Sequence, residues 1–366
     1  MILASGDSQP PIYGGRYRSR SEELDGGTGT VVICDDPNLD RVVAIKFLHA
    51  QVPKRRIFDE IHALQRIRSK HVVQIYDVVI EPPANQIGVV QEYITGHDLR
   101  SLTHEAMTVD EALLLLYQVS SGLADIHREN LIHRDVKPNN IKRDDEGIIK
   151  IFDFDLARTK GGEAQTVGFR GTIGYAAPEL FAVGAVVFTQ AIDVYAFGAT
   201  ALFCIEGDLP PELTQIPPQP ELWKAKGGFS SLRVKLPPAI AGLLDDCLST
   251  SPTARPPIET VRAAVAKHLL ENRHRALLLV NNKPMVLDAA SRFVKVTMAQ
   301  VGNISLSYDG LRFVVTAVQG DVSINNKQAV SGSLVHGCSV ITLGAPALGT
   351  ARNFVTLDVA HPEVVL

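Results

Sequence analysis

Hydrophobic and polar positions follow different patterns in successive parts of the chain. Val/Ile-rich runs at 30–33 and 42–47 bracket the turn-like stretch CDDPNLDR, and two further apolar runs cover 72–80 and 87–93. Between these pairs, apolar residues recur at helical spacing from Ile57 to Ile67. Such runs favour strands, and a repeat of three to four residues favours a helix. The first part is therefore predicted to be a small, mainly β lobe.

Beyond residue 108 the pattern becomes helical. Four apolar segments have the length and spacing of helices, and short strands are expected around the acidic motifs: 112–126, 181–205, 239–248 and 258–270. The second of these is apolar enough to suggest a membrane span, but Thr189, Gln190 and Asp193 near its middle favour a buried core helix. The proline-rich stretch 209–221 is predicted as an extended surface loop, with a polyproline binding site as the less favoured alternative.

A third pattern begins after the charged run ENRHR, where Val, Leu and Ile alternate with Asn, Gly and Asp turns up to Leu366. Short alternating runs separated by turns are typical of a β-sandwich. We therefore expect a flexible segment over 1–15, a two-lobed domain over 16–270, a linker over 271–276 and a sandwich over 277–366. The expected fold class is α+β, with an all-β domain at the end.

Composition narrows the protein class. The 366 residues are 45% hydrophobic and 21% charged with a formal net charge of −4, which is typical of a soluble globular protein and gives no reason to expect nucleic-acid binding. The four cysteines lie far apart, without metal-ligand spacing, which favours reduced thiols in the cytoplasm and neither a disulfide nor zinc. The first fifteen residues lack the basic start and apolar stretch of a secretory signal.

The runs HRDVKPNNI and DFD concentrate the chemistry of phosphoryl transfer in about twenty residues. Asp135 can accept the proton of an incoming hydroxyl group, and Lys137 can neutralise the moving phosphoryl group. Asn140 and Asp153 can hold Mg²⁺ through oxygen atoms. This cluster predicts a phosphotransferase.

A glycine cluster and a lysine complete the phosphate site. The glycines suit a strand turn whose backbone approaches phosphate oxygens closely: Gly26, Gly27 and Gly29. Lys46 follows seventeen residues after the last of them, on a predicted strand that can direct an ammonium group to the same phosphates. Glu60, on the next helix, is the candidate counter-ion of Lys46, and a solvated helix carboxylate is the alternative.

In this order and spacing, the motifs resemble the eukaryotic-type protein kinases of bacteria from Tyr17 to about Leu270. The segments VVQEYITGHDL, GTIGYAAPE, DVYAFG and SPTARP also carry the resemblance. It implies a bilobal kinase fold, ATP with Mg²⁺ or Mn²⁺ as cofactors, protein substrates, and a possible homodimer. Lys137 together with Thr172 resembles the serine/threonine pattern. The implied reaction is transfer of the ATP γ-phosphoryl group to protein Ser or Thr hydroxyls.

The resemblance also implies roles by position. Gln91 corresponds to the gatekeeper behind the adenine, Glu92 to Ile94 to the hinge, and Asp98 to the ribose contact. The adenine would be enclosed by Val31, Ala44 and Lys142. The apolar column that couples the two lobes would be formed by Leu64, Ile75, His133 and Phe154.

Further roles concern the segment that follows DFD. Glu179 and Arg255 match a buried ion pair that holds this activation segment, and Asp193 matches the residue that braces the catalytic loop. Arg134 beside Asp135 resembles kinases ordered by phosphorylation, because a buried arginine favours an anionic partner. The preferred phosphate acceptor is Thr166, followed by Thr159, whereas Thr172 is expected in the substrate-docking loop.

Three positions depart from the family pattern. Leu24 replaces the first glycine of the phosphate loop, Asp155 replaces the glycine of DFG, and Lys142 replaces an apolar residue under the adenine. The stem of Lys142 can pack beneath the base while its ammonium group reaches outward. The catalytic residues are all present, so an active enzyme is favoured over the alternative, a nucleotide-binding pseudokinase scaffold.

The stretch GDVSINNKQAVSGSLVHGCSVITLG resembles the closing strands of forkhead-associated domains, which hold phosphothreonine peptides. The arginine and the Ser-x-x-His pair of that family have no counterpart in register here. An interaction or regulatory sandwich without a phosphate pocket is therefore favoured, and a phosphoprotein-binding domain is the alternative.

Overall fold

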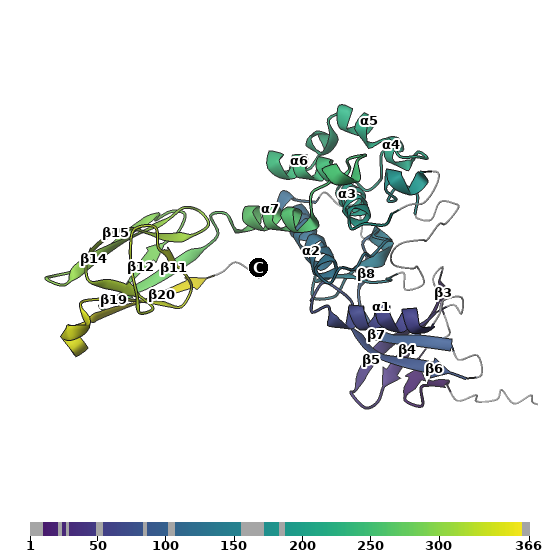
Figure 1. The fold of residues 1–366 in the computed structure, drawn as a ribbon, viewed down its shortest axis with the longest axis horizontal. Helices are drawn as coiled ribbons and strands as arrows, with labels where there is room; N and C mark the ends of the chain where they lie inside the picture. Colours follow the sequence, from purple (N-terminus) through teal and green to yellow (C-terminus); the bar gives the residue numbers. More distant parts are fainter. Residues whose placement is uncertain are drawn as a thin grey trace, which may run out of the picture. The chain divides into compact units, whose positions relative to one another are not determined.

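The computed structural model describes residues 10–20, 24–26, 29–48, 54–82, 86–101, 107–154, 172–182 and 187–360. Its contacts divide the chain into two compact units, Met1–Arg262 and Ala263–Leu366. The first unit holds a β-rich lobe and a helical lobe, and the second holds two further β sheets (Figure 1). The predicted α+β fold class is confirmed.

The β-rich lobe is built on one antiparallel sheet with strand order β1-β2-β4-β5-β7-β6, and β3 pairs with β4. Its strands are β1 (Ile12–Tyr13), β2 (Tyr17–Ser19), β3 (Leu24–Gly26), β4 (Gly29–Asp36), β5 (Arg41–Leu48), β6 (Ile75–Glu81) and β7 (Gln86–Glu92). Helix α1 (Lys54–Arg66) contacts β6 and lies along the sheet (Figure 1). The predicted strands and helix are therefore present, but β1 lies within the segment that was expected to be flexible.

Strand β5 connects the core of this lobe to the candidate site. Val43, Ile45 and Phe47 belong to the buried cluster on one face of the sheet. Because successive side chains of a strand point to opposite faces, Ala44 and Lys46 face the other side. The alternation of β5 thus directs Lys46 away from the core cluster.

The helical lobe contains the helices α2 (Val109–Arg128), α3 (Ala191–Glu206), α4 (Pro211–Thr214), α5 (Pro220–Ala225), α6 (Pro238–Cys247) and α7 (Ile258–Leu270). A small sheet of order β10-β9-β8 accompanies them, formed by β8 (His97–Asp98), β9 (Ile141–Arg143) and β10 (Ile149–Ile151). Short 3₁₀ turns cover Pro138–Asn140, Pro178–Phe181, Gly228–Ser231 and Pro252–Ala254. Helix α2 begins with a capping box, in which the Thr108 hydroxyl accepts from the Glu111 backbone and the Glu111 side chain accepts from the Thr108 backbone.

Two predictions for this lobe are wrong in detail. Helix α3 begins at Ala191, ten residues later than expected. The proline-rich stretch is not a continuous extended loop, because α4 and α5 form there with proline in their first turn, where the missing N–H costs little. Helix α3 is buried along most of its length, as a core helix should be. Within the described ranges, no helix combines the length and apolar character needed to cross a membrane.

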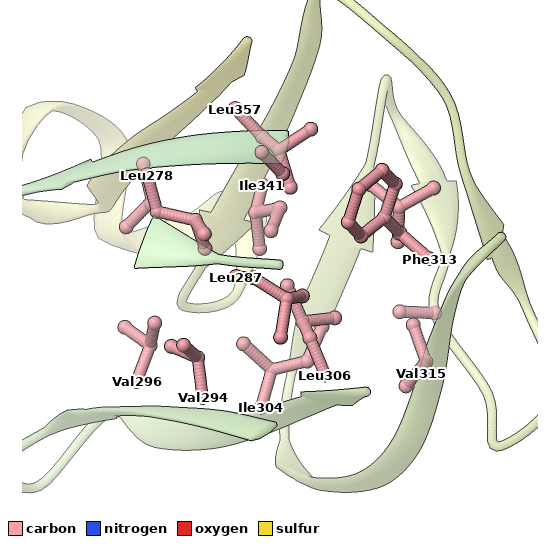
Figure 2. Close-up of a cluster of buried hydrophobic side chains, with 14 of the residues drawn as sticks. Leu278, Leu287, Val294, Val296, Ile304, Leu306, Phe313, Val315, Ile341 and Leu357 are labelled. Carbon is pink, nitrogen blue, oxygen red and sulfur yellow. The ribbon is translucent and has the colours of Figure 1, made fainter. Parts of the chain in front are cut away.

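The second unit is a sandwich of two antiparallel sheets with strand orders β12-β11-β20-β19-β16-β17 and β13-β14-β15-β18. The strands are β11 (Arg275–Val280), β12 (Lys283–Leu287), β13 (Phe293–Met298), β14 (Gly302–Tyr308), β15 (Phe313–Gly320), β16 (Val322–Ile324), β17 (Lys327–Gln328), β18 (Leu334–Val335), β19 (Ser339–Leu343) and β20 (Asn353–Ala360), with a 3₁₀ segment at Pro346–Ala351. Figure 2 shows side chains of both sheets meeting in one core, among them Leu278, Ile341 and Leu357 from the larger sheet and Ile304 and Leu306 from the smaller.

The predicted linker is partly integrated into this sandwich. Strand β11 begins at Arg275. The Asn272 backbone donates a 2.7 Å hydrogen bond to the Gly310 carbonyl, and the Arg292 guanidinium donates a 2.6 Å bond to the Asn272 side chain. The structured part of the sandwich therefore starts before residue 277.

Candidate active site

The catalytic loop is fixed by a carboxylate from α3. Asp193 is 1% exposed, and its two oxygens accept 2.8 Å hydrogen bonds from the backbone N–H groups of His133 and Arg134. The Nε2 atom of His127 lies 2.9 Å from the same carboxylate. Burial opposes ionisation of Asp193, but these partners outweigh it and lower its pKa. The bracing role predicted for Asp193 fits this geometry.

The loop residues that Asp193 braces present a polar cluster around Asp135. Lys137 Nζ lies 2.7 Å from Asp135 Oδ2 and donates a 3.0 Å bond to Thr172 Oγ1, which in turn donates a 3.1 Å bond to Asp135 Oδ1. The Asn140 amide donates 2.8 and 2.9 Å bonds to the Asp135 carbonyl and carboxylate. Burial of Asp135 raises its pKa, but the Lys137 hydrogen bond and charge lead the opposing effects, and the net pKa lies below the usual value. Asp135 is therefore an anion at neutral pH.

Lys46 contacts a different carboxylate from the one proposed for it. Its ammonium group donates to Asp153 Oδ1, so the pair joins β5 of the β-rich lobe to the DFD segment of the helical lobe. The prediction named Glu60 as counter-ion. Glu60 lies on α1, but its side chain is outside the described part of the structure. Asp153 thus takes the place of the expected partner.

Asn140 and Asp153 offer oxygen donors that fit a magnesium ion. Because the Asn140 amide nitrogen donates to Asp135, its carbonyl oxygen points the other way and is available as a ligand. Carboxylate and amide oxygens are the donors that Mg²⁺ prefers. Asp153 adopts a left-handed backbone with φ of 64°, which requires support from its surroundings.

The phosphate loop shows why glycine is needed at one position. Gly29 has φ of 151°, and a Cβ atom there would lie 2.1 Å from the Phe47 carbonyl oxygen. Gly26 pairs with Gly29 at the end of the β3 and β4 hairpin. A side chain at Gly29 would force the hairpin away from β5.

The base-binding residues lie on adjacent strands. Ala44 on β5 is the register partner of Gln91 on β7, and Val31 on β4 is the partner of Lys46. The hinge residue Glu92 follows Gln91 at the end of β7, and its carboxylate lies 2.7 Å from Lys150 Nζ.

Lys142 differs from the prediction in the direction of its ammonium group. Instead of reaching outward, Lys142 Nζ donates a 3.2 Å hydrogen bond to the Ile94 carbonyl of the hinge. Lys142 is also the register partner of Asp98, the predicted ribose contact, whose carboxylate accepts a 2.8 Å bond from the Ser101 backbone. The sequence pattern gave no signal for the bond between Lys142 and the hinge.

Two further predicted contacts are present. The His133 and Phe154 rings lie with centroids 4.7 Å apart, as expected for neighbours in the apolar column, whose other members Leu64 and Ile75 lie on α1 and β6. Arg255 and Glu179 form two 2.7 Å hydrogen bonds, and Arg255 also donates to the Ser249 and Ala191 carbonyls at 2.9 Å. Its side chain is fully buried, so this pair is an internal tether.

Several predicted residues fall outside the described ranges. They are Gly27, Asp155, Thr159 and Thr166, and the side chain of Leu24 is likewise not described. Sequence reasoning missed His127, which supports Asp193 from the end of α2. A histidine in the last turn of a helix is common for electrostatic reasons alone, so it carried no specific signal.

The site geometry agrees with the comparison against known families, in which the protein kinase domain matches residues 22–267. The chain belongs to the protein kinase family. The kinase domain is 34% identical over 212 residues to the probable serine/threonine-protein kinase pknA2 of Bifidobacterium longum, covering 54% of this chain and 27% of that protein. It is 33% identical over 216 residues to PknA of Corynebacterium glutamicum (56% and 46%). It is 31% identical over 205 residues to PrkC of Bacillus subtilis (54% and 31%). The kinase-domain match thus spans less than half the length of each of these relatives.

Proposed function

We propose that this protein is an active serine/threonine protein kinase that transfers the γ-phosphoryl group of ATP to protein hydroxyls. The observation that carries the proposal is the cluster of Asp135, Lys137, Asn140 and Thr172, held by hydrogen bonds of 2.7 to 3.1 Å. The relatives named as serine/threonine kinases support the same activity.

The chemistry assigned to this chain is mainly positioning and charge stabilisation. Asp135, ionised at neutral pH, orients the acceptor hydroxyl and receives its proton. Lys137, already beside Asp135, neutralises charge on the transferred group. Lys46 holds the phosphates of the nucleotide, and Gly26 and Gly29 let the backbone approach them.

ATP and a divalent metal ion are the cofactors that this site would use. Asn140 and Asp153 would hold the ion, and Mg²⁺ fits their oxygen donors. A bound ion would bridge phosphate oxygens and neutralise developing charge. Mn²⁺ is the alternative metal, since it accepts the same donors.

Serine/threonine specificity is supported by the bond between Lys137 and Thr172. The lysine reaches across from the catalytic loop to the GTIGYAAPE segment, so the two residues shape one wall beside Asp135. We also propose autophosphorylation in the activation segment, with Thr166 preferred over Thr159. Arg134, next to Asp135, is the proposed partner of that phosphate.

The activity is tested by incubating the full chain with γ-labelled ATP, Mg²⁺ and a generic basic protein, followed by phosphoamino-acid analysis. The proposal expects label on serine and threonine. Nucleotide binding without any transfer would support the pseudokinase scaffold instead. Mass spectrometry of the same sample tests Thr166 and Thr159 as acceptors.

We propose that the sandwich is an interaction domain with a forkhead-associated-like arrangement. The resembling stretch contributes β16, β17, β18 and β19, and these strands belong to both sheets around one core. Binding of phosphothreonine and unmodified peptides should be compared on the full chain. Loss of binding after phosphatase treatment would assign a phosphopeptide reader, and equal affinity for both peptides would assign a domain without a phosphate pocket.

A further inference from the structure

The two outer faces of the sandwich differ in character. On the six-stranded sheet, β11 is apolar on both sides: Ala276 and Leu278 face the core, whereas Leu277 and Leu279 point outward and are 43% and 44% exposed. On the four-stranded sheet, outward positions of β13 and β14 are mostly polar, including Lys295, Thr297, Asn303 and Ser307. A strand that is apolar on both faces is typical of a sheet covered on both sides.

The exposed apolar residues of the larger sheet are neighbours. In the pairing register, Leu279 lies between Pro284 of β12 and Thr356 of β20, and Val340 of β19 is the next partner of Thr356. One row away, Leu277 lies beside Val286. We name the outward residues of these four strands the outer face: Leu277, Leu279, Pro284, Val286, Val340, Phe354, Thr356 and Asp358, with Arg352 at its edge.

Charge on the outer face is arranged along β20 and its leading residue. Outward positions alternate as Arg352, Phe354, Thr356 and Asp358, so a cation stands at one end and an anion at the other. The Arg352 guanidinium lies 5.7 Å from the centre of the Phe354 ring, which places both on this face. A copy turned by a two-fold axis across the middle of β20 would bring Asp358 opposite Arg352, and the reverse.

We propose that the outer face binds a second copy of this chain, forming a two-fold homodimer through the sandwich. A two-fold interface needs a surface that is complementary to itself, and this face supplies apolar residues at its centre with opposite charges at exchanged ends. Four strands ~4.8 Å apart and six residues of ~3.3 Å each give ~400 Å² of sheet plane per copy. That size is at the low end of specific interfaces, so the dimer is weak and depends on concentration.

The proposal is tested by sedimentation velocity on the full chain across concentrations from ~1 to ~200 μM, a range that brackets a micromolar dissociation constant. The average mass should rise from that of one chain towards that of two. Leu277→Lys should raise the dissociation constant ~10-fold or more, because it places a charge at the apolar centre. The matched control is Phe293→Lys, which changes a 59% exposed side chain on the other sheet and should leave the mass profile unchanged.

A charge exchange tests the two-fold geometry. Asp358→Arg alone should weaken the dimer, since it sets like charges against each other, and the double variant Asp358→Arg with Arg352→Asp should restore it. Thermal unfolding of each variant confirms that the sandwich is folded. The proposal is overturned if the wild-type chain keeps the mass of one copy at every concentration, or if Phe293→Lys weakens a dimer that Leu277→Lys leaves intact. Failure of the double variant to restore the dimer would overturn the two-fold arrangement.

Discussion

The ammonium group of Lys46 contacts the Asp153 carboxylate, 107 residues further along the chain. This ion pair joins β5, which carries residues of the base-binding site, to the segment that is proposed to hold the metal ion. Lys46 is buried on its strand, so its position follows from the strand alternation that sends Val43, Ile45 and Phe47 into the core. The arrangement places one cation between two halves of the site.

Replacing Lys46 by methionine keeps the length and apolar volume of the side chain but removes its charge. Phosphoryl transfer to a protein substrate should fall ~100- to 1,000-fold, comparable to loss of one preorganised electrostatic contact. Steady-state kinetics with Mg²⁺ and ATP would measure this. The exposed Lys70→Met variant is the control, and an equal loss in both variants would argue against a specific role for Lys46.

The tether between Glu179 and Arg255 should contribute to stability far more than a surface pair of the same length. Because Glu179→Gln leaves the buried Arg255 charge poorly compensated, the free energy of unfolding should drop by ~3 to 5 kcal/mol. The comparison is Asp125→Asn, which removes a 2.7 Å pair with the exposed Arg128 and should cost less than ~1 kcal/mol. Chemical denaturation of the two variants gives both values, and similar losses would contradict the internal role of Arg255.

The lowered pKa of Asp193 leads to a pH dependence of stability. A carboxyl group whose pKa is depressed in the folded state stabilises the fold above its unfolded value, which is near 3.8, and loses that contribution as the pH falls through the folded value. Asp193→Asn should therefore unfold with ~3 kcal/mol less free energy at neutral pH. The difference from wild type should shrink below about pH 3.8, as measured by denaturation at several pH values. A difference that stays constant into the acid range would show that the charge of Asp193 is not responsible.

Lys142 allows packing and hydrogen bonding to be separated. Lys142→Met keeps the stem beneath the predicted adenine position and removes only the donor to the Ile94 carbonyl, so the KM for ATP should change less than about threefold. Lys142→Ala also removes most of the stem, and at ~0.8 kcal/mol per buried methylene group the KM should rise ~10-fold or more. A large effect of the methionine variant would instead assign the main contribution to the hydrogen bond.

The sequence predicted the parts of this fold that depend on local pattern or on a compact motif. Helices α1 and α7 and strands β4 to β7 follow directly from hydrophobic spacing, and the polar cluster around Asp135 comes from one loop. The start of α3 was misplaced because residues 187–190 are non-helical despite apolar neighbours. The helical turns α4 and α5 were missed because proline, read as a helix breaker, is tolerated in a first turn.

The contacts that sequence could not supply are those between distant elements. Lys46 could pair with several acidic residues, and only the packing of the two lobes selects Asp153. The bond from Lys142 to the hinge depends on β8 and β9 pairing beside Ile94, which no spacing rule encodes. The apolar outer face appears only when β11, β20 and β19 are brought together.

The most direct test of the central proposal is single-turnover transfer from γ-labelled ATP by Asp135→Asn. The substitution keeps size and polarity but removes the anion that is proposed to accept the hydroxyl proton. Transfer should fall ~100- to 10,000-fold, with ATP binding retained and the exposed Asp145→Asn control unchanged. Transfer by Asp135→Asn at the wild-type rate would contradict the proposal that this cluster carries out the reaction.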